Sequence, residues 1–143
     1  MSNLKTINIL GHAYFITTRV AGGISLFIDD SYCQIIINNF NFYRKTKQFK
    51  LVGYVIMPTH MHYIIWPIGR YSISEILRDF KKQTAKDIIK HLKQDKRAGR
   101  IFNPPFQSSG IMNPAYTLGA RKLLELFYKN SVKQEYQVWQ ARN

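Results

Sequence analysis

Two apolar runs separated by a proline–threonine pair constrain this chain more than any other feature. Residues 51–57 and 60–67 are rich in β-branched and aromatic side chains, and only Pro58 and Thr59 lie between them. Runs of that length and composition are typical of β-strands. A two-residue connection is short enough for an antiparallel pair. The sequence therefore predicts a β-hairpin around which the rest of the chain folds.

The second run opens with two histidines, His60 and His62. Successive strand residues point to opposite faces, so the two imidazoles would share one face with their Cβ atoms about 6–7 Å apart. At that separation they can bind one metal ion while Met61 points into the core. The alternative is a pair of ordinary strand histidines, one hydrogen-bonded and one at the rim. The cost of desolvating two imidazoles among apolar neighbours favours the metal site.

The charge of the chain points to a polyanionic partner. Among its 143 residues, 21 Lys and Arg stand against 8 Asp and Glu, a formal charge of +13. Nucleic acid is the first candidate and an anionic membrane surface the second; a basic surface kept for solubility is the alternative. With 45% hydrophobic and 14% aromatic residues, the sequence predicts one globular domain over residues 1–143.

Cysteine usage and hydropathy indicate the compartment. Cys33 is the only cysteine, which excludes a disulfide framework and favours a small buried side chain. No stretch is long and apolar enough for a membrane span, and the first residues lack the apolar region of a signal peptide. These features predict a cytoplasmic protein.

Hydrophobic periodicity and turn signals predict the remaining elements. They are a strand at 14–20, a helix from about 29 to 45, a helix from about 72 to 95, a helix at 120–130 and a short strand or extended segment at 134–139. Residues 96–114 are predicted to form a long connection. This order predicts an α+β fold, an antiparallel sheet with helices packed on one face.

The helix predicted at about 72–95 has one apolar side and one basic side. The basic residues on its polar side and just beyond it are Lys82, Lys86, Lys90, Lys93 and Arg97. Lys82, Lys90 and Arg97 have no acidic residue at the four-residue spacing and in the order that stabilises a helix. We therefore expect this side to contact phosphates, and the alternative is an ordinary solvated face.

The hairpin also resembles a known motif. Residues 55–62, with the sequence VIMPTHMH, resemble the His-hydrophobic-His signature of single-tyrosine transposases, in particular the REP-associated tyrosine transposases. Further segments match the family in its own order: GHAYFITTR at 11–19, FKKQT at 80–84 and YQVWQ at 136–140. The chain has Thr59 where the family usually has Asn.

This resemblance implies a ferredoxin-like fold with the histidine pair on the sheet. It implies metal-assisted nicking and rejoining of hairpin-flanked single-stranded DNA through a phosphotyrosine, with Mg²⁺ or Mn²⁺ as cofactor. Two imidazoles suit Mn²⁺ better than Mg²⁺, which prefers oxygen ligands. Arg19 and the basic helix residues are the expected DNA contacts. Because relatives often dimerise, a homodimer is an expectation as well.

The chain departs from the family's pattern at the nucleophile. The family places its tyrosine on a helix after the Trp-Gln segment, with a metal ligand four residues later. This chain has three residues after Gln140, so we expect it to lack that helix. Tyr136 and Gln140 have the required spacing and are the candidate nucleophile and third ligand, although they lie within the Trp-Gln segment. Coincidence is the favoured alternative.

The sequence therefore leaves three functions to be compared. The first is a nicking and rejoining transposase, and the second is an inactive, truncated remnant that only binds DNA. The third, an unrelated metal-dependent hydrolase, often has Asp-His shortly after His-x-His, and Ile64 and Ile65 argue against it. Trp66 and Trp139 are expected either to be buried or to stack on bases.

Overall fold

The computed structural model describes residues 9, 11–94, 120–129 and 136–140. Its strands are β1 (Tyr14–Arg19), β2 (Phe49–Ile56) and β3 (His60–Pro67), and its α-helices are α1 (Asp30–Thr46), α2 (Ile73–Gln94) and α3 (Ala120–Lys129). Two short 3-10 helices, η1 (Ala21–Gly23) and η2 (Leu26–Ile28), connect β1 to α1. The connection predicted at 96–114 and Arg97 lie outside the described residues.

The three strands form an antiparallel sheet in the order β1-β3-β2, so the histidine-bearing strand is central. Residues 136–140 lie along the other side of β1, where Val20 and Trp139 form an antiparallel bridge. Val138 O accepts a hydrogen bond from Ala21 N at 2.8 Å, and Arg19 O accepts one from Gln140 N at 2.9 Å. With this short segment as the fourth member, the order matches the predicted ferredoxin-like arrangement.

The β2–β3 hairpin forms where the sequence predicts it, and its turn is held by the preceding chain. Met57 N donates to His60 O across the turn at 2.8 Å. Pro58 O accepts from Phe27 N, and Thr59 O accepts from Val20 N. The turn that leads into the histidine strand is therefore fixed by backbone bonds to η2 and to the end of β1.

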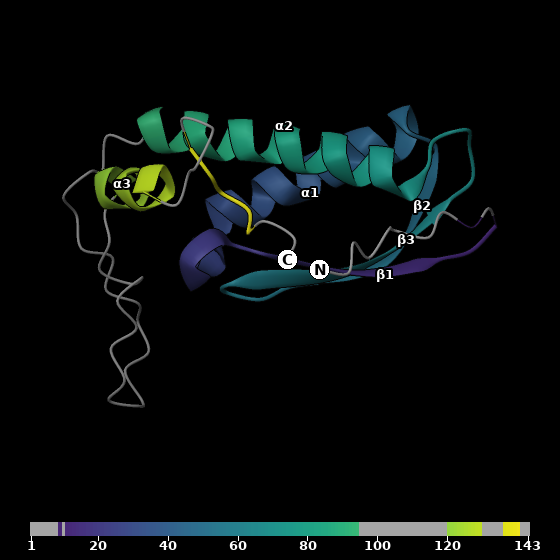
Figure 1. Cartoon of the computed structure of the whole chain (residues 1–143), viewed down its shortest axis with the longest axis horizontal. Coiled ribbons are helices and arrows are strands. Elements are labelled where there is room, and N and C mark those ends of the chain that lie inside the picture. Colours follow the sequence, from purple (N-terminus) through teal and green to yellow (C-terminus); the bar gives the residue numbers. More distant parts are fainter. Residues whose placement is uncertain (1–8, 10, 95–119, 130–135, 141–143) are drawn as a thin grey trace, which may run out of the picture.

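Helices α1 and α2 cover one face of the sheet (Figure 1). Between them and the sheet, the rings of Phe40 and Phe80 stack at 4.5 Å, and Tyr63 meets Phe40 edge-on at 5.2 Å. The Tyr63 hydroxyl is hydrogen-bonded to Thr18 Oγ1 at 2.9 Å, so its polar end is satisfied inside the core. Among the described elements, no helix packs on the opposite face, which is the face of His60 and His62.

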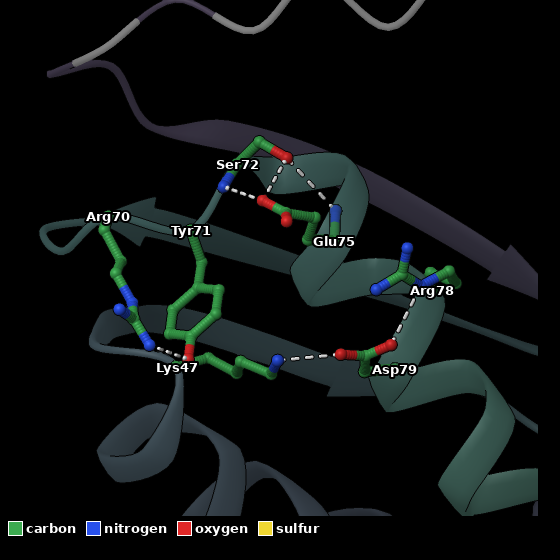
Figure 2. A network of polar contacts seen from close by, with 7 residues as sticks. All are labelled: Lys47, Arg70, Tyr71, Ser72, Glu75, Arg78 and Asp79. Atoms are coloured by element: carbon green, nitrogen blue, oxygen red, sulfur yellow. Dashed lines mark hydrogen bonds and ion pairs between the residues drawn. The ribbon is translucent and has the colours of Figure 1, made fainter.

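Side chains cap the first turns of α1 and α2. Asp29 Oδ1 accepts from Ser31 N at 2.9 Å at the start of α1. Before α2, Ser72 N donates to Glu75 Oε2 and Glu75 N donates to Ser72 Oγ, a reciprocal capping box. Ser72 is therefore the cap of α2 (Figure 2).

A polar network joins the end of α1 to the start of α2 (Figure 2). Asp79 accepts from Arg78 at 2.9 Å and from Lys47 at 2.7 Å. These hydrogen bonds lower the pKa of the Asp79 carboxyl to about 2. Lys47 Nζ also lies 4.1 Å from the centre of the Tyr71 ring, whose hydroxyl accepts from Arg70. The network fixes α2 against α1 at the end nearest the β3–α2 connection.

Candidate metal centre and nucleic-acid interface

His60 and His62 lie on the uncovered face of the sheet, as the strand alternation predicts. Arg19 of β1 pairs with His60, and Thr17 pairs with His62. The two imidazole rings are 4.9 Å apart at an interplanar angle of 81°. Both residues are half-buried. The pair is therefore accessible and close enough for both rings to contact a single ion.

Each imidazole is oriented by a threonine hydroxyl. Thr59 Oγ1 is 3.0 Å from His60 Nδ1, and Thr17 Oγ1 is 2.9 Å from His62 Nδ1. A hydrogen bond at Nδ1 fixes the ring and leaves Nε2 as the nitrogen for a ligand. Sequence reasoning missed both hydroxyls. Thr59, at the position where the family usually has Asn, here supplies one of them.

The described residues bring two imidazoles together and no larger cluster of potential ligands. In these parts of the chain, no group of three or more His, Cys, Asp or Glu side chains could hold a metal ion. Gln140, the candidate third ligand, is exposed and its backbone is bonded to Arg19, which in turn pairs with His60. Gln140 is therefore in register with His60, one strand beyond Arg19, and its role as a ligand remains a prediction.

Tyr136, the candidate nucleophile, lies on the helix side of the molecule. Its ring meets that of Tyr128 in α3 at 6.1 Å, and Lys93 Nζ of α2 lies 4.9 Å from its centre. The histidines face the other side of the sheet. The structure thus places Tyr136 against α2 and α3, and its role as a nucleophile also remains a prediction.

A basic groove runs along α2, between this helix and residues 136–139, with a volume of about 980 Å³. Its cationic lining residues are Arg78, Lys81, Lys82, Lys86, Lys90 and Lys93. None of the described residues that line it is acidic. Within the described ranges, no acidic side chain forms an ion pair with Lys82, Lys86 or Lys90. The predicted basic side of the helix is thus one wall of a concave surface suited to a polyanion.

The two tryptophans have different environments. Trp139 is buried, and its Nε1 donates to Lys81 O at 3.0 Å and to Thr84 Oγ1 at 3.1 Å. It fixes residues 136–140 to α2 and is not a stacking surface. Trp66 lies on the histidine face and is 40% exposed. Of the two candidates for stacking on bases, only Trp66 is accessible.

These features define an α+β protein with a ferredoxin-like sheet, a histidine pair on its open face and a basic groove along α2. The model of the family described as "Transposase IS200 like" matches residues 25–115, which include the hairpin and α2. The chain belongs to the IS200-like transposase family, as its motifs predict.

A solved structure agrees with this assignment. The structure of the REP-associated tyrosine transposase bound to a REP hairpin is similar to this chain, with a TM-score of 0.53 and 26% sequence identity. The match covers 61% of this chain and 53% of that one, so this chain matches about half the length of that protein. No curated protein matches the sequence. Among the described residues, no helix is both long and apolar enough to cross a membrane.

Proposed function

We propose that this protein binds hairpin-flanked single-stranded DNA and nicks and rejoins it through a phosphotyrosine intermediate. The observation that carries this proposal is the pair of imidazoles on the open sheet face, each held at Nδ1 by a threonine hydroxyl. Family membership and the hairpin-bound transposase that resembles this chain support the choice of substrate.

The histidine pair fits part of a divalent metal site. Its Nε2 atoms are the donors that would hold the ion, and imidazole donors favour Mn²⁺ over Mg²⁺. When bound, such an ion supplies charge neutralisation at the phosphoryl oxygens of the scissile phosphate. The Thr17 and Thr59 hydroxyls keep both rings in place before the DNA arrives, so little reorganisation is needed on binding.

The reaction requires a tyrosine hydroxyl at the scissile phosphate. The tyrosine oxygen loses its proton and forms a bond to phosphorus, while the P–O3′ bond breaks. The released 3′ oxygen takes up a proton to give a free 3′-OH. Rejoining is the same exchange in reverse, because the covalent intermediate keeps the energy of the phosphodiester bond.

The basic groove of α2 is the proposed binding site for the DNA backbone. Its exposed lysines, Lys82, Lys86, Lys90 and Lys93, are spaced along the helix. Cations arranged in this way bind phosphates independently of base sequence, with an affinity that falls as salt rises. Arg19, exposed on the open face beside His60, is the proposed phosphate contact nearest the histidines.

The test is covalent capture. The protein is incubated with hairpin-flanked single-stranded DNA and Mn²⁺, and a denaturing gel is examined for a protein–DNA adduct. We expect an adduct that disappears with a chelator and with His60→Ala or His62→Ala. If Tyr136 is the nucleophile, Tyr136→Phe abolishes the adduct while Tyr128→Phe, a change to its exposed neighbour, does not.

A second function, DNA binding without cleavage, is favoured by the place of Tyr136. Its ring contacts the helix layer, on the side of the sheet opposite the histidine face. Under this alternative, a gel shift is seen without any adduct. His60→Ala and His62→Ala then leave the shift intact, because the affinity comes from phosphate contacts to α2. Absence of a shift at low salt contradicts both functions.

A further inference from the structure

The sheet face that carries the histidines is also apolar and open to solvent. Phe15 of β1, Val55 of β2 and Trp66 of β3 are 69%, 47% and 40% exposed. Strand alternation places all three on the same face as His62. Large apolar side chains gathered on one face of a sheet mark a binding surface more than scattered ones do.

The exposed aromatic rings are aligned with the histidine pair. Phe15 stacks on the imidazole of His62, with ring centres 5.4 Å apart and an interplanar angle of 19°. Along β3, His62, Ile64 and Trp66 follow at intervals of about 6–7 Å on this face. That spacing is comparable to the distance between successive bases of an extended single strand. The apolar surface therefore begins at the histidines, and its side chains follow along β3 at about the spacing of successive bases.

The surface is also shallow beside these rings. Gly53 of β2 pairs with Ile64, and a Cβ atom added at Gly53 would meet nothing within 4 Å. A flat group lying on Phe15 and Ile64 would thus find open space above the neighbouring strand.

The charges around this face suit a polyanion. Lys50 pairs with Trp66, and its Nζ lies 5.4 Å from the centre of the Trp66 ring. Exposed Arg19 pairs with His60 at the other end of the line. None of the three strands contains an acidic residue. Cations at both ends of an aromatic surface without carboxylates match the mixed chemistry of single-stranded nucleic acid, in which flat bases alternate with phosphates.

We propose that this face binds the unpaired bases next to the phosphate held at the histidine pair, with Phe15 stacking on the nearest base and Trp66 on one further along. The inference rests on the proposed function and deepens it, because it assigns to the open sheet face the single-stranded part of the substrate. Paired bases are already stacked within a duplex and do not offer their faces, so the hairpin stem is left to the groove along α2.

The experiment compares two fluorescent oligonucleotides by anisotropy, at low salt and in the presence of a chelator. One is a hairpin alone, and the other is the same hairpin with unpaired nucleotides at both ends. For the wild-type protein, we expect tighter binding of the tailed oligonucleotide. Phe15→Ala should weaken tailed binding by about 5- to 150-fold, the range for loss of one stacked base. It should leave binding of the bare hairpin unchanged.

Two further variants control for folding and for general loss of apolar surface. Phe15→Trp keeps a stacking surface and should retain tailed binding. Phe42→Ala removes a phenylalanine that is 59% exposed on α1, away from the sheet face, and should change neither affinity. Because Phe15 is exposed, its variants should unfold at the wild-type temperature.

The outcomes separate the inference from the function on which it rests. Equal binding of the two oligonucleotides by the wild-type protein, or equal tailed binding by wild type and Phe15→Ala, overturns the inference and leaves the proposed function standing. Failure of the wild-type protein to bind either oligonucleotide overturns both. A wild-type dimer that dissociates in Phe15→Ala with tailed affinity unchanged would show that a second copy covers this face, which also overturns the inference.

Discussion

Two threonine hydroxyls determine how the histidine rings are presented. Thr17 is exposed and its hydroxyl is 2.9 Å from His62 Nδ1. Thr17→Val removes this contact while keeping a β-branched side chain suited to a strand. We expect Mn²⁺ affinity, measured by calorimetry, to fall by about 10-fold or more, as is typical when an outer partner of a metal-binding histidine is lost.

A matched control is available on the helix layer. Thr46 donates to Phe42 O near the end of α1 and is also exposed. Thr46→Val should leave Mn²⁺ affinity unchanged. If Thr17→Val binds the ion as tightly as the wild-type protein, the hydroxyl does not orient the ring.

At the scale of single residues, the sequence predicted on which face the histidines lie, but not which side chains contact them. Alternation along one strand is enough to place His60 and His62 on a common face. The bond between Thr17 and His62 joins residues 45 positions apart and depends on the register of β1 against β3. No pattern within either strand defines that register. The contact between Thr17 and His62 was therefore visible only in the structure.

Helix α2 has a basic side that should bind DNA through phosphates. Replacing Lys82, Lys86 and Lys90 with alanine should weaken binding of single-stranded DNA. It should also make the slope of log affinity against log salt shallower by about 2, at about 0.7 per lost phosphate contact. Fluorescence anisotropy at several salt concentrations measures both. Helix formation should be unaffected, because alanine has the highest helix propensity.

The control for this variant removes charge elsewhere. Arg44 and Lys45 are exposed near the end of α1, outside the groove. Their replacement with alanine lowers net charge but should change the salt slope much less. An equal change in both variants would mean that the affinity for DNA depends only on the total charge of the protein.

The segment 136–140 is attached to α2 through Trp139. Trp139→Phe removes the indole N–H that bonds to Lys81 O and to Thr84 Oγ1. Loss of a buried donor and of part of the ring should destabilise the protein by about 1–3 kcal/mol in urea unfolding. Trp66→Phe, at the exposed tryptophan, should have little effect. Equal losses would show that the indole bonds do not anchor the segment.

At the scale of elements, start and end signals in the sequence were informative. Side-chain caps at Asp29 and Ser72 begin α1 and α2 close to the predicted starts at about 29 and 72, because side-chain capping is a local interaction. The irregularity of β2 between Leu51 and Gly53 was missed, since a bulge depends on the partner strand. Trp139 was considered for base stacking, yet its environment is set by Lys81 and Thr84 of α2, more than fifty residues earlier in the chain.

The stability of the whole molecule depends on pH through the carboxyl group of Asp79. Hydrogen bonds from Arg78 and Lys47 lower the pKa of its carboxyl to about 2, against about 3.9 when unfolded. The folded state therefore favours the carboxylate, and this stabilisation is present above about pH 4 and is lost as the pH falls toward 2. Urea unfolding between pH 2 and pH 7 should show stability declining in that window.

The Asp79→Asn variant measures how much of the pH dependence of stability comes from this carboxyl group. It should be less stable than the wild-type protein at pH 7 and should lose less stability on acidification. Glu125→Gln, which removes an exposed ion pair with Lys122, is the comparison and should follow the wild-type profile. A profile for Asp79→Asn that parallels that of wild type would exclude Asp79 as the source.

At the scale of the whole molecule, the order of elements was enough to predict the fold class. The polyanionic partner that the net charge favours remains a prediction. The sequence predicted the basic side of the second long helix, but it did not show where the cations of the strands lie relative to it. Lys82 and its neighbours line a groove beside α2, whereas Arg19 and Lys50 flank the opposite face of the sheet. Such a division depends on which surface each element buries, and that is decided only when the layers pack.

The central place of β3 has a consequence for hydrogen exchange. Both neighbours of this strand bond to it, so its amide protons can reach deuterated solvent only when the sheet separates. The amides of residues 60–65 should therefore be among the slowest to exchange, and those on the outer edge of β2 among the fastest of the strands. Fraying of the outer edge of β2 would leave the distance between the two imidazoles unchanged.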